Sequence, residues 1–184
     1  MPASSFAADD VGCIYSLGVT TGTSATTYGP SDFVTREQMA AFLARMIRYA
    51  IDGNCTDPHP FVDVPETSFA YGDVGCIADM GITTGTSETT YSPAAFVTRE
   101  QMAAFLARML RALTGLPCDD HDHPFTDVGA GSFAKDDVGC IYHHGITTGT
   151  GATTYGPGNL VTREQMAAFL ARIYRLLSDP TTYP

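Results

Sequence analysis

The clearest pattern along the chain is an apolar stripe at helical spacing that returns three times. In its middle occurrence the stripe consists of Met102, Phe105, Leu106, Met109 and Leu110. Residues at these intervals share one face of a helix. Thr98 precedes the stripe and Gln101 follows Thr98 by three residues, which is the pattern of a capping box. The sequence therefore predicts a long helix that begins directly after Thr98.

A weaker apolar pattern precedes each long helix. In the second copy it predicts a short helix from Ser68 to Met80, and Gly81 is a natural stop for that helix. Residues 58–64 predict an extended lead-in that ends at Pro65. Residues 82–93 are rich in Thr, Ser and Gly and predict a loop. Its Tyr and Pro return in every copy, which indicates a turn of fixed shape.

The whole chain consists of three copies of this unit. One twelve-residue phrase begins at Val34, Val97 and Val161, so successive copies are 63 and 64 residues apart. Such a regular internal repeat predicts a fold built from three similar units. We place the units at residues 1–53, 54–115 and 116–184, the first without a lead-in. A unit this small cannot bury its apolar long helix alone, so we expect a mainly α fold in which three long helices pack about a pseudo-three-fold axis.

Charge and length exclude several classes of partner. The formal net charge is −10 and the isoelectric point is near 4.6. An acidic surface disfavours nucleic acid, whose phosphates need a basic face, and it disfavours attraction to an anionic membrane. No segment is apolar over the length of a bilayer, so we expect no membrane insertion. Because the first copy lacks a lead-in, we interpret the chain as an excised piece, and a missing targeting signal says little.

Five cysteines indicate disulfide bonds. Cys13, Cys76 and Cys140 occupy one repeated position, whereas Cys55 and Cys118 lie just before the lead-ins of copies two and three. Pairing within a copy gives Cys55–Cys76 and Cys118–Cys140, and pairing across copies gives Cys13–Cys55 and Cys76–Cys118. We favour pairing within a copy, because only this pairing explains the odd number of cysteines: the partner of Cys13 would belong to the absent first lead-in. Pairing across copies and free thiols stay open as alternatives. Such bonds indicate an oxidising compartment, and each would stabilise the fold by about 3 kcal/mol.

All nine arginines lie on the predicted long helices, at three positions in each copy. The two later positions in each copy (Arg45 and Arg48 in the first) lie toward the helix C-terminus, where the dipole favours a cation and a structural role suffices. The first position follows the capping Thr, where the dipole opposes a cation; it is occupied by Arg36, Arg99 and Arg163. Either a neighbouring carboxylate compensates this charge, or an external anion binds the guanidinium together with the N–H groups of the helix N-terminus.

Taken together, these motifs resemble the S-layer homology family. That family's unit contains an aromatic-x-Asp-Val lead-in, an aromatic-Ala pair, a Gly-Ile-x-x-Gly turn, an aromatic-x-Pro loop and a Thr-Arg helix start. In the second copy they stand as Phe61-Val62-Asp63-Val64, Phe69-Ala70, Gly81-Ile82-Thr83-Thr84-Gly85, Tyr91-Ser92-Pro93 and Thr98-Arg99-Glu100-Gln101. The match extends over all three copies except the first lead-in. Phe stands where the family commonly has Trp.

The resemblance implies an extracellular module of the cell wall or cell surface, whose triplets form a three-pronged spindle around a central three-helix bundle. It implies a non-catalytic anchor that holds a larger parent protein on the wall by binding acidic, often pyruvylated, cell-wall polysaccharide in inter-repeat grooves. By resemblance, the ligand-binding residues are Arg36, Arg99 and Arg163 for the acidic group, Gly22, Gly85 and Gly149 for close backbone approach, and Phe6, Phe69 and Phe133 in place of the sugar-stacking aromatic.

A rival hypothesis is a structural module that self-associates or binds a partner protein, with the arginines held in internal ion pairs. Arginines exposed in a groove beside an aromatic residue would favour the polysaccharide. Arginines buried against Asp63, Asp73 or their equivalents would favour the structural module.

Metal binding and catalysis receive little support from the sequence. His121-Asp122-His123, beside Asp119 and Asp120, is a weak zinc signal, because a structural site needs four ligands; a solvated acidic loop is the favoured interpretation. His143 and His144 occur only in the third copy, and we expect them at the surface. No Ser/His/Asp or Cys/His set recurs, so we expect neither an enzyme nor a cofactor.

Overall fold

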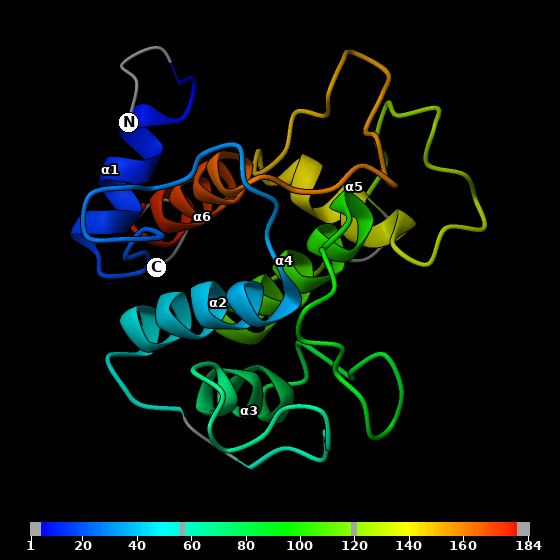
Figure 1. The fold of residues 1–184 in the computed structure, drawn as a ribbon. Coiled ribbons are helices and arrows are strands. Elements are labelled where there is room, and N and C mark those ends of the chain that lie inside the picture. Colours follow the sequence, from blue (N-terminus) through cyan, green and yellow to red (C-terminus); the bar gives the residue numbers. More distant parts are fainter. Residues whose placement is uncertain (1–4, 56–57, 119–120, 180–184) are drawn as a thin grey trace.

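A computed structural model describes residues 5–55, 58–118 and 121–179 of the 184-residue chain. These residues form short and long helices in alternation, joined by loops, with isolated β-bridges and no strand (Figure 1). The short helices are α1 (Ala8–Ser16), α3 (Tyr71–Asp79) and α5 (Lys135–His143), and the long ones are α2 (Arg36–Ile51), α4 (Arg99–Thr114) and α6 (Arg163–Leu177). The prediction of a mainly α fold is confirmed.

Each long helix begins at the capping box that the sequence predicts. At the start of α4, the Thr98 hydroxyl accepts the N–H of Gln101 at 3.4 Å, and the Gln101 side-chain oxygen accepts the N–H of Thr98 at 3.2 Å. The same pair of bonds occurs at the starts of α2 and α6. The predicted apolar stripe of α4 is buried, so the stripe does form the core face of the helix.

The segments that lead into the long helices close a ring of backbone hydrogen bonds. Val34 N–H donates to Val161 O at 2.9 Å, Val97 N–H donates to Val34 O at 3.0 Å, and Val161 N–H donates to Val97 O at 3.0 Å. All three valines are fully buried. Each repeat thus bonds the other two in the same way, as expected for pseudo-three-fold packing, and α2 packs directly on α4. The three-pronged outline of a spindle stays a prediction.

Each short helix packs on the long helix of another repeat: α3 on α2, α5 on α4, and α1 on α6. An ion pair supports each contact, and the three pairs are Arg48–Asp73 at 2.6 Å, Arg111–Asp137 at 3.0 Å and Arg175–Asp10 at 2.7 Å. The last pair joins the first repeat to the third. The last arginine of each set therefore has the structural role that its position indicates.

Two details differ from the predicted unit. The short helix of the second repeat begins at Tyr71 rather than Ser68, because the Ser68 hydroxyl accepts the N–H of Ala70 at 3.2 Å and holds residues 68–70 in a turn. The lead-in is extended only as far as Phe61 and then turns over residues 62–64. This turn brings the Asp63 carboxylate to the backbone of the loop at Tyr91.

The cysteines pair within repeats, as the favoured pairing has it: Cys55 with Cys76 and Cys118 with Cys140. Cys13 is free among the described residues. Each bond joins the segment before a lead-in to the short helix of its own repeat. The long helices α2 and α4 end close to the expected unit boundaries at 53/54 and 115/116, which stay predictions. No described helix has the length and apolar character that crossing a membrane requires.

Candidate functional site

Three similar grooves lie between the repeats, and every repeat contributes to each of them. We name them by the long helix that forms their floor. The α2 groove contains Gly22, Phe69 and Arg163; the α4 groove contains Gly85, Phe133 and Arg36; the α6 groove contains Gly149, Phe6 and Arg99. The structure therefore sorts the nine candidate residues into three sets. Each set takes its glycine, phenylalanine and arginine from three different repeats.

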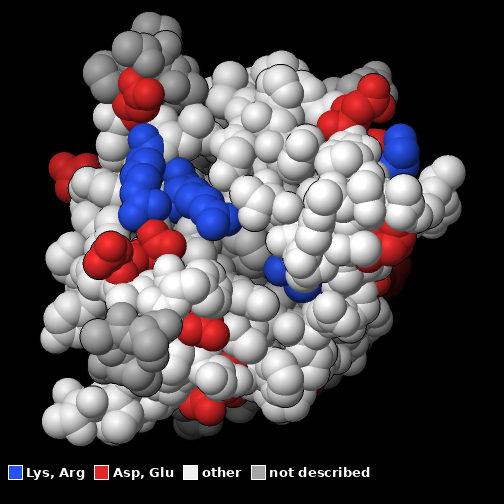
Figure 2. Space-filling view, turned by 90° about the horizontal axis from the view of Figure 1, so that it is seen from above, with Lys and Arg blue, Asp and Glu red and all other residues white. Residues whose placement is uncertain are grey.

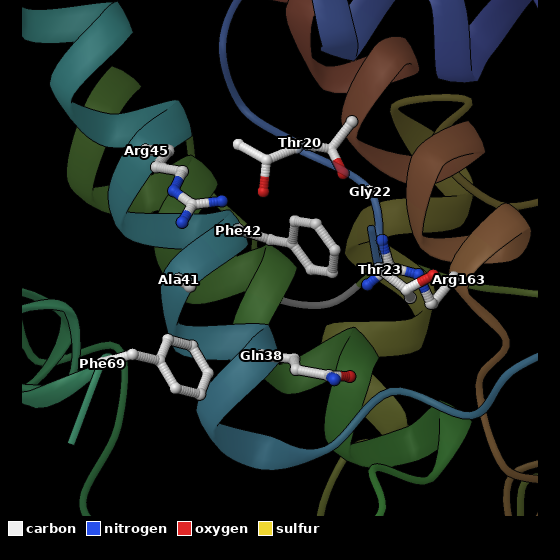
Figure 3. A pocket seen from close by; sticks show the side chains of 10 residues that line it. Thr20, Gly22, Thr23, Gln38, Ala41, Phe42, Arg45, Phe69 and Arg163 are labelled. Atoms are coloured by element: carbon white, nitrogen blue, oxygen red, sulfur yellow. The ribbon is translucent and has the colours of Figure 1, made fainter. Parts of the chain in front are cut away.

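The walls of the α2 groove show how such a site is built (Figure 3). Residues 20–23 form one side, and Gln38, Ala41, Phe42 and Arg45 project from α2. These four helical positions follow the i, i+3, i+4, i+7 spacing of a single helix face. Arg45 and Arg163 lie on opposite sides of Phe42. The cavities measure about 290 Å³ in the α2 groove and about 370 Å³ in each of the other two.

The first arginine of each long helix is buried in the wall of a neighbouring groove. Arg36 is only 4% exposed, and its Nε donates to the carbonyl oxygen of Tyr91 at 2.6 Å. Its guanidinium carbon lies 4.5 Å from the centre of the Tyr91 ring and 5.4 Å from that of Phe105. The Nη2 atom is buried and has no hydrogen-bond partner within the described part of the chain. The guanidinium is therefore held through Nε, and its buried Nη2 donor is left unpaired.

The same arrangement recurs in the other two grooves. Arg99 Nε donates to Tyr155 O at 2.7 Å, and Arg163 Nε donates to Tyr28 O at 2.7 Å. Both guanidinium groups lie over the corresponding tyrosine ring and over a phenylalanine of a long helix, and both leave a buried Nη2 unpaired among the described residues. An unpaired buried donor on a charged group is costly. Its threefold repetition points to a shared purpose.

The structure overturns one part of the predicted anion site. The N–H groups at the start of α2 are already used: Arg36 N–H donates to Ala95 O and Glu37 N–H to Pro93 O, while those of Gln38 and Met39 bond Thr35. The equivalent groups of α4 and α6 are used in the same way. The helix start therefore offers an anion no free backbone donor, and any anion must be bound by side chains.

The placement of these arginines matches neither of the two arrangements that would distinguish the polysaccharide anchor from the structural module. Among the described residues, none of the three first-position arginines forms an ion pair, although Asp63, Asp127 and Asp32 act on Arg36, Arg99 and Arg163 at longer range. They are also not openly exposed. Burial lowers the pKa of Arg36, Arg99 and Arg163 from the usual arginine value. An anion beside the guanidinium would offset this cost, because an opposite charge favours the ionised form.

The lead-in aspartate holds the loop that carries each tyrosine. The Asp63 carboxylate accepts the N–H groups of Tyr91 and Ser92 at 2.8 and 2.7 Å. Asp127 does the same for Tyr155 and Gly156, at 2.8 Å each. Burial alone would raise the pKa of both carboxyls, but the hydrogen bonds from backbone N–H groups outweigh it and lower the pKa. The ionised Asp63 thus supports the position of Tyr91 O, and with it that of Arg36.

Tyrosine burial differs between the grooves. Tyr91 and Tyr155 are fully buried, whereas Tyr28, which has no lead-in aspartate before it in this chain, is half-buried. Burial raises the pKa of Tyr28 to about 12 and raises the pKa of the other two well above the ordinary tyrosine value. All three phenols therefore stay protonated and can donate a hydrogen bond at neutral pH.

One exposed aromatic side chain borders each groove. Phe6, Phe69 and Phe133 are 66%, 65% and 64% exposed. Single exposed hydrophobic residues are ordinary, but here the same exposed residue stands at the same place in three grooves. A flat apolar ring beside a guanidinium suits a ligand that has both an apolar face and an anionic group.

The groove glycines serve the loop's own turn. Gly22, Gly85 and Gly149 have φ near +79°, a conformation that favours glycine. A Cβ at Gly85 would lie 2.5 Å from Thr90 O and would also overlap Phe61. Glycine is thus required here by the local fold, and close approach of a ligand to its backbone stays a prediction.

The sequence analysis missed a second arginine in each groove. Arg45, Arg108 and Arg172 line the three grooves and donate to backbone carbonyls at Val19, Ile82 and Ile146. We expected them toward the helix C-terminus, but the last turn of α2 contains Arg48 rather than Arg45. The sequence spacing does indicate this position in the groove, because Arg45 lies on the same helix face as Gln38, Ala41 and Phe42.

On the face shown in Figure 2, basic side chains lie beside acidic ones, and broad areas carry no charge. Two guanidinium groups per groove are therefore a strong local feature on a chain of net charge −10. Local positive charge of this kind selects an anion without attracting polyanions over the whole surface.

Two of the histidines have a repeated structural role. His59 and His123 each accept the N–H of the phenylalanine two residues later through Nδ1, and each ring stacks on that phenylalanine. Asp119 and Asp120, which the weak zinc signal included, lie outside the described residues. His144 is half-buried, so the expectation that both histidines of the pair lie at the surface is wrong for this residue.

Comparison with known proteins agrees with this architecture. The profile of the S-layer homology domain matches residues 2–40, 60–103 and 124–167, one match for each repeat. The chain belongs to the S-layer homology family. The resemblance seen in the sequence motifs is thus confirmed, with three tandem copies of the family's unit.

Relatives of this S-layer homology chain include enzymes and surface proteins. An endoglucanase of Bacillus sp. (strain KSM-635) is 36% identical over 125 residues, covering 68% of this chain and 13% of that protein. An S-layer protein of Bacillus thuringiensis subsp. finitimus is 23% identical over 175 residues, covering 94% of the chain and 20% of that protein. A cell surface protein of Thermoanaerobacter kivui is 29% identical over 105 residues, covering 56% and 14%. The chain spans no more than a fifth of these relatives.

Proposed function

We propose that this chain is a non-catalytic anchor that binds acidic cell-wall polysaccharide in its three inter-repeat grooves and thereby holds a parent protein on the wall. As an S-layer homology module it is a cell-surface module. The relatives named as enzymes share only a small part of their length with it, which supports attachment rather than catalysis as its task.

The observation that carries the proposal is the unpaired, buried Nη2 of the groove arginine, present three times. A carboxylate is the natural partner for a guanidinium, because two parallel N–H···O bonds match its planar fork. Arg163 and Arg45 both line the α2 groove, so an acidic group there would meet two positive charges. A carboxylate-bearing substituent such as a pyruvate ketal has this chemistry.

The exposed phenylalanine supports a sugar as the carrier of that acidic group. The C–H face of a pyranose ring is apolar and flat, and packing it on Phe69 would remove apolar surface from water. Thr20, Thr21 and Thr23, with Gly22 between them, supply hydroxyl and backbone groups on the opposite wall. Cavities of about 290–370 Å³ lie at the small end of ligand sites, about 300–1,000 Å³, and suit one or two sugar units in each groove.

Three equivalent grooves would give strong retention from weak sites. A polymer with a repeating acidic substituent can occupy a second groove at a high effective concentration once the first is bound. The apparent affinity of the polymer would then exceed that of one repeating unit by about 100-fold or more.

A calorimetric titration with purified acidic cell-wall polysaccharide tests the proposal. The comparison is between the unaltered chain and a triple variant, Arg36→Lys, Arg99→Lys and Arg163→Lys. Lysine keeps the charge but lacks the guanidinium fork, and this exchange is not conservative at a bidentate site. We expect binding to be lost in a variant that is still helical by circular dichroism. Equal binding by both proteins would overturn the role of these arginines.

One observation favours the rival function, a structural or protein-binding module. The bonds from Arg36, Arg99 and Arg163 to tyrosine carbonyls join separate repeats, so the arginines do stabilise the assembly. Absence of any heat on titration, together with concentration-dependent association in sedimentation, would favour this module over the polysaccharide anchor.

A further inference from the structure

The third repeat brings together the ligand types of a metal site. The Sγ atoms of Cys118 and Cys140 and a ring nitrogen of His144 lie within 4.8 Å of one another. Both cysteines are fully buried, and the buried Nε2 of His144 has no hydrogen-bond partner among the described residues. Thiolate sulfur and imidazole nitrogen are the ligands that Zn²⁺ prefers. In this structure the two sulfurs are joined as a disulfide.

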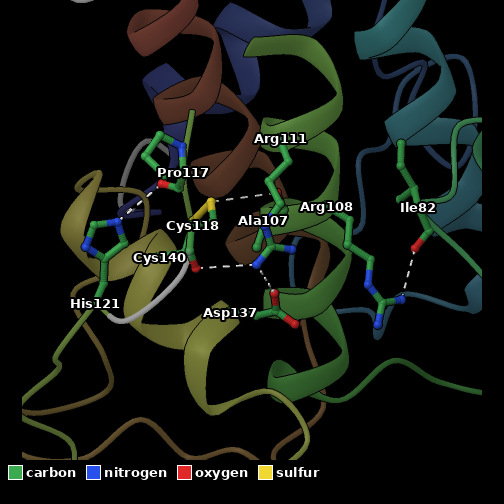
Figure 4. A network of polar contacts seen from close by, with 9 residues as sticks. All are labelled: Ile82, Ala107, Arg108, Arg111, Pro117, Cys118, His121, Asp137 and Cys140. Carbon is green, nitrogen blue, oxygen red and sulfur yellow. Dashed lines mark hydrogen bonds and ion pairs between the residues drawn. A yellow bond between two sulfur atoms is a disulfide. The ribbon is translucent and has the colours of Figure 1, made fainter. Parts of the chain in front are cut away.

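His121 lies beside this group but its ring nitrogens are outside the 4.8 Å set, so its side chain must shift to become a fourth ligand. Its ring lies edge-on to that of His144, with 5.9 Å between the centres. Its Nε2 lies 3.3 Å from the carbonyl oxygen of Pro117 (Figure 4), so a proton on Nε2 leaves Nδ1 with a free lone pair. Such a bond to a backbone carbonyl is what usually orients a metal-binding histidine.

The backbone at His121 is held firmly against α5. A Cβ at Gly139 would overlap the carbonyl oxygen of His121. Only glycine therefore allows the segment to lie this close to α5, which carries Cys140 and is followed by His144 at its C-cap. The spacings Cys118-x₂-His121 and Cys140-x₃-His144 are of the short kind found in structural zinc sites.

The second repeat shows that the disulfide needs no histidine. Cys55 and Cys76 form the same bond, yet the residue four positions after Cys76 is Met80, where the third repeat has His144. The first repeat has Leu17 there. An apolar residue is thus sufficient for packing at this position, and packing does not explain the histidine.

We propose that the third repeat, in its dithiol form, binds Zn²⁺ through Cys118, Cys140, His144 and His121. The disulfide and the zinc site are then two alternative states of the same two cysteines. Either state ties the segment before the lead-in to α5.

The interconversion needs a thiol reductant. A dithiol passes two electrons and two protons to the S–S bond, becomes a disulfide itself, and leaves Cys118 and Cys140 as thiols. Zn²⁺ then displaces the two thiol protons, and two neutral imidazoles complete the tetrahedron. A two-electron oxidant such as a small disulfide reverses the process and releases the ion.

Cobalt(II) titration of the full chain tests the proposal, because tetrahedral Co²⁺ with thiolate ligands absorbs visible light and Zn²⁺ displaces it. The chain is reduced with a dithiol, desalted without oxygen and titrated beside the oxidised chain. We expect one equivalent of Co²⁺ in the reduced chain and none in the oxidised chain. No stoichiometric binding after reduction would overturn the proposal, and so would two equivalents, since the second repeat would then bind equally.

Variants identify the ligands. His144→Met installs the residue of the second repeat, so the fold should persist, and it should weaken binding about 100-fold or more, since even outer partners of a metal are worth 10- to 100-fold. His121→Ala should have a comparable effect. His143→Ala is the matched control, because its ring stacks on His121 without belonging to the proposed set, and its affinity should stay within about tenfold. Unchanged metal affinity in His144→Met would overturn the assignment of ligands. Metal affinity that is lost in His143→Ala but kept in His121→Ala would also overturn it.

Discussion

Arg36 and Tyr91 belong to different repeats and hold each other through two hydrogen bonds that run in opposite directions. Arg36 Nε donates to Tyr91 O at 2.6 Å, and the Tyr91 hydroxyl donates to Arg36 O at 2.8 Å. Arg99 with Tyr155 and Arg163 with Tyr28 repeat this pair. The residue proposed to bind the ligand is thus also a link between repeats. Loss of binding in an alanine variant alone would therefore not separate the two roles.

Removing the tyrosine hydroxyl tests the link. Tyr91→Phe and Tyr155→Phe each leave a buried arginine carbonyl without its donor, so we expect each to lower the free energy of unfolding by about 1–2 kcal/mol. Tyr28→Phe should cost less, because Tyr28 is half-buried and water can replace the lost bond. Urea denaturation measures all three. A larger cost for Tyr28→Phe than for Tyr91→Phe would contradict this explanation.

The exposed phenylalanines should matter for binding but not for folding. We expect the triple variant Phe6→Ala, Phe69→Ala and Phe133→Ala to unfold within about 0.5 kcal/mol per site of the unaltered chain, as exposed substitutions usually do, while its affinity for polysaccharide falls. Tyr15→Ala is the matched control, since Tyr15 is equally exposed at 66% and lies outside the three grooves. Affinity that falls as much in the control as in the triple variant would refute a specific role for the groove phenylalanines.

Acid should weaken the loops that carry Tyr91 and Tyr155. The folded pKa of Asp63 and of Asp127 is lowered by hydrogen bonds from backbone N–H groups. Their stabilisation is therefore complete above the ordinary aspartate pKa of about 3.9 and is lost as the pH falls through the lower, folded pKa. Unfolding by urea at pH 7, 5 and 3 measures the change.

Asp63→Asn and Asp127→Asn provide the control for that experiment. An amide keeps one acceptor oxygen but has no carboxylate to titrate. We expect the double variant to be less stable at pH 7 and to lose less stability than the unaltered chain between pH 5 and pH 3. An identical loss in both proteins would show that other groups control acid unfolding.

The inter-repeat ion pairs should differ in strength with their exposure. In the Arg48–Asp73 pair the side chains are 24% and 11% exposed, whereas in Arg175–Asp10 the arginine is 54% exposed. We expect Asp73→Asn to cost about 1.5–3 kcal/mol, the range for hydrogen bonds to charged groups, and Asp10→Asn to cost about 0–1 kcal/mol. Thermal or urea unfolding in low and high salt would compare them. Equal costs would contradict the dependence on burial.

Local signals in the sequence predicted the long helices well. Thr98 and Gln101 form the expected capping box, and the apolar stripe after them is buried, because both depend on neighbours within a few residues. The start of the short helix was less predictable, since the Ser68 side chain competes with the helix for the N–H of Ala70. Residues of this type often make such local bonds.

The composition of each groove could not be predicted from local signals. Motifs indicated that Arg163, Gly22 and Phe69 matter, but only the packing of the whole chain decides that these three meet. Which neighbour's arginine enters a groove depends on the ring at Val34, Val97 and Val161, and on α1 packing against α6 at the far end of the sequence. The full use of the helix N–H groups by neighbouring loops has the same long-range origin.

The most direct test of the proposed anchor compares one polysaccharide in two chemical forms. The acidic polymer is titrated into the chain by calorimetry before and after its acidic substituents are removed by mild acid, with the sugar backbone intact. We expect binding of the native polymer with up to three occupied grooves for each chain, and no measurable binding of the stripped polymer. Equal binding of both forms would contradict recognition of an acidic group by Arg36, Arg99 and Arg163.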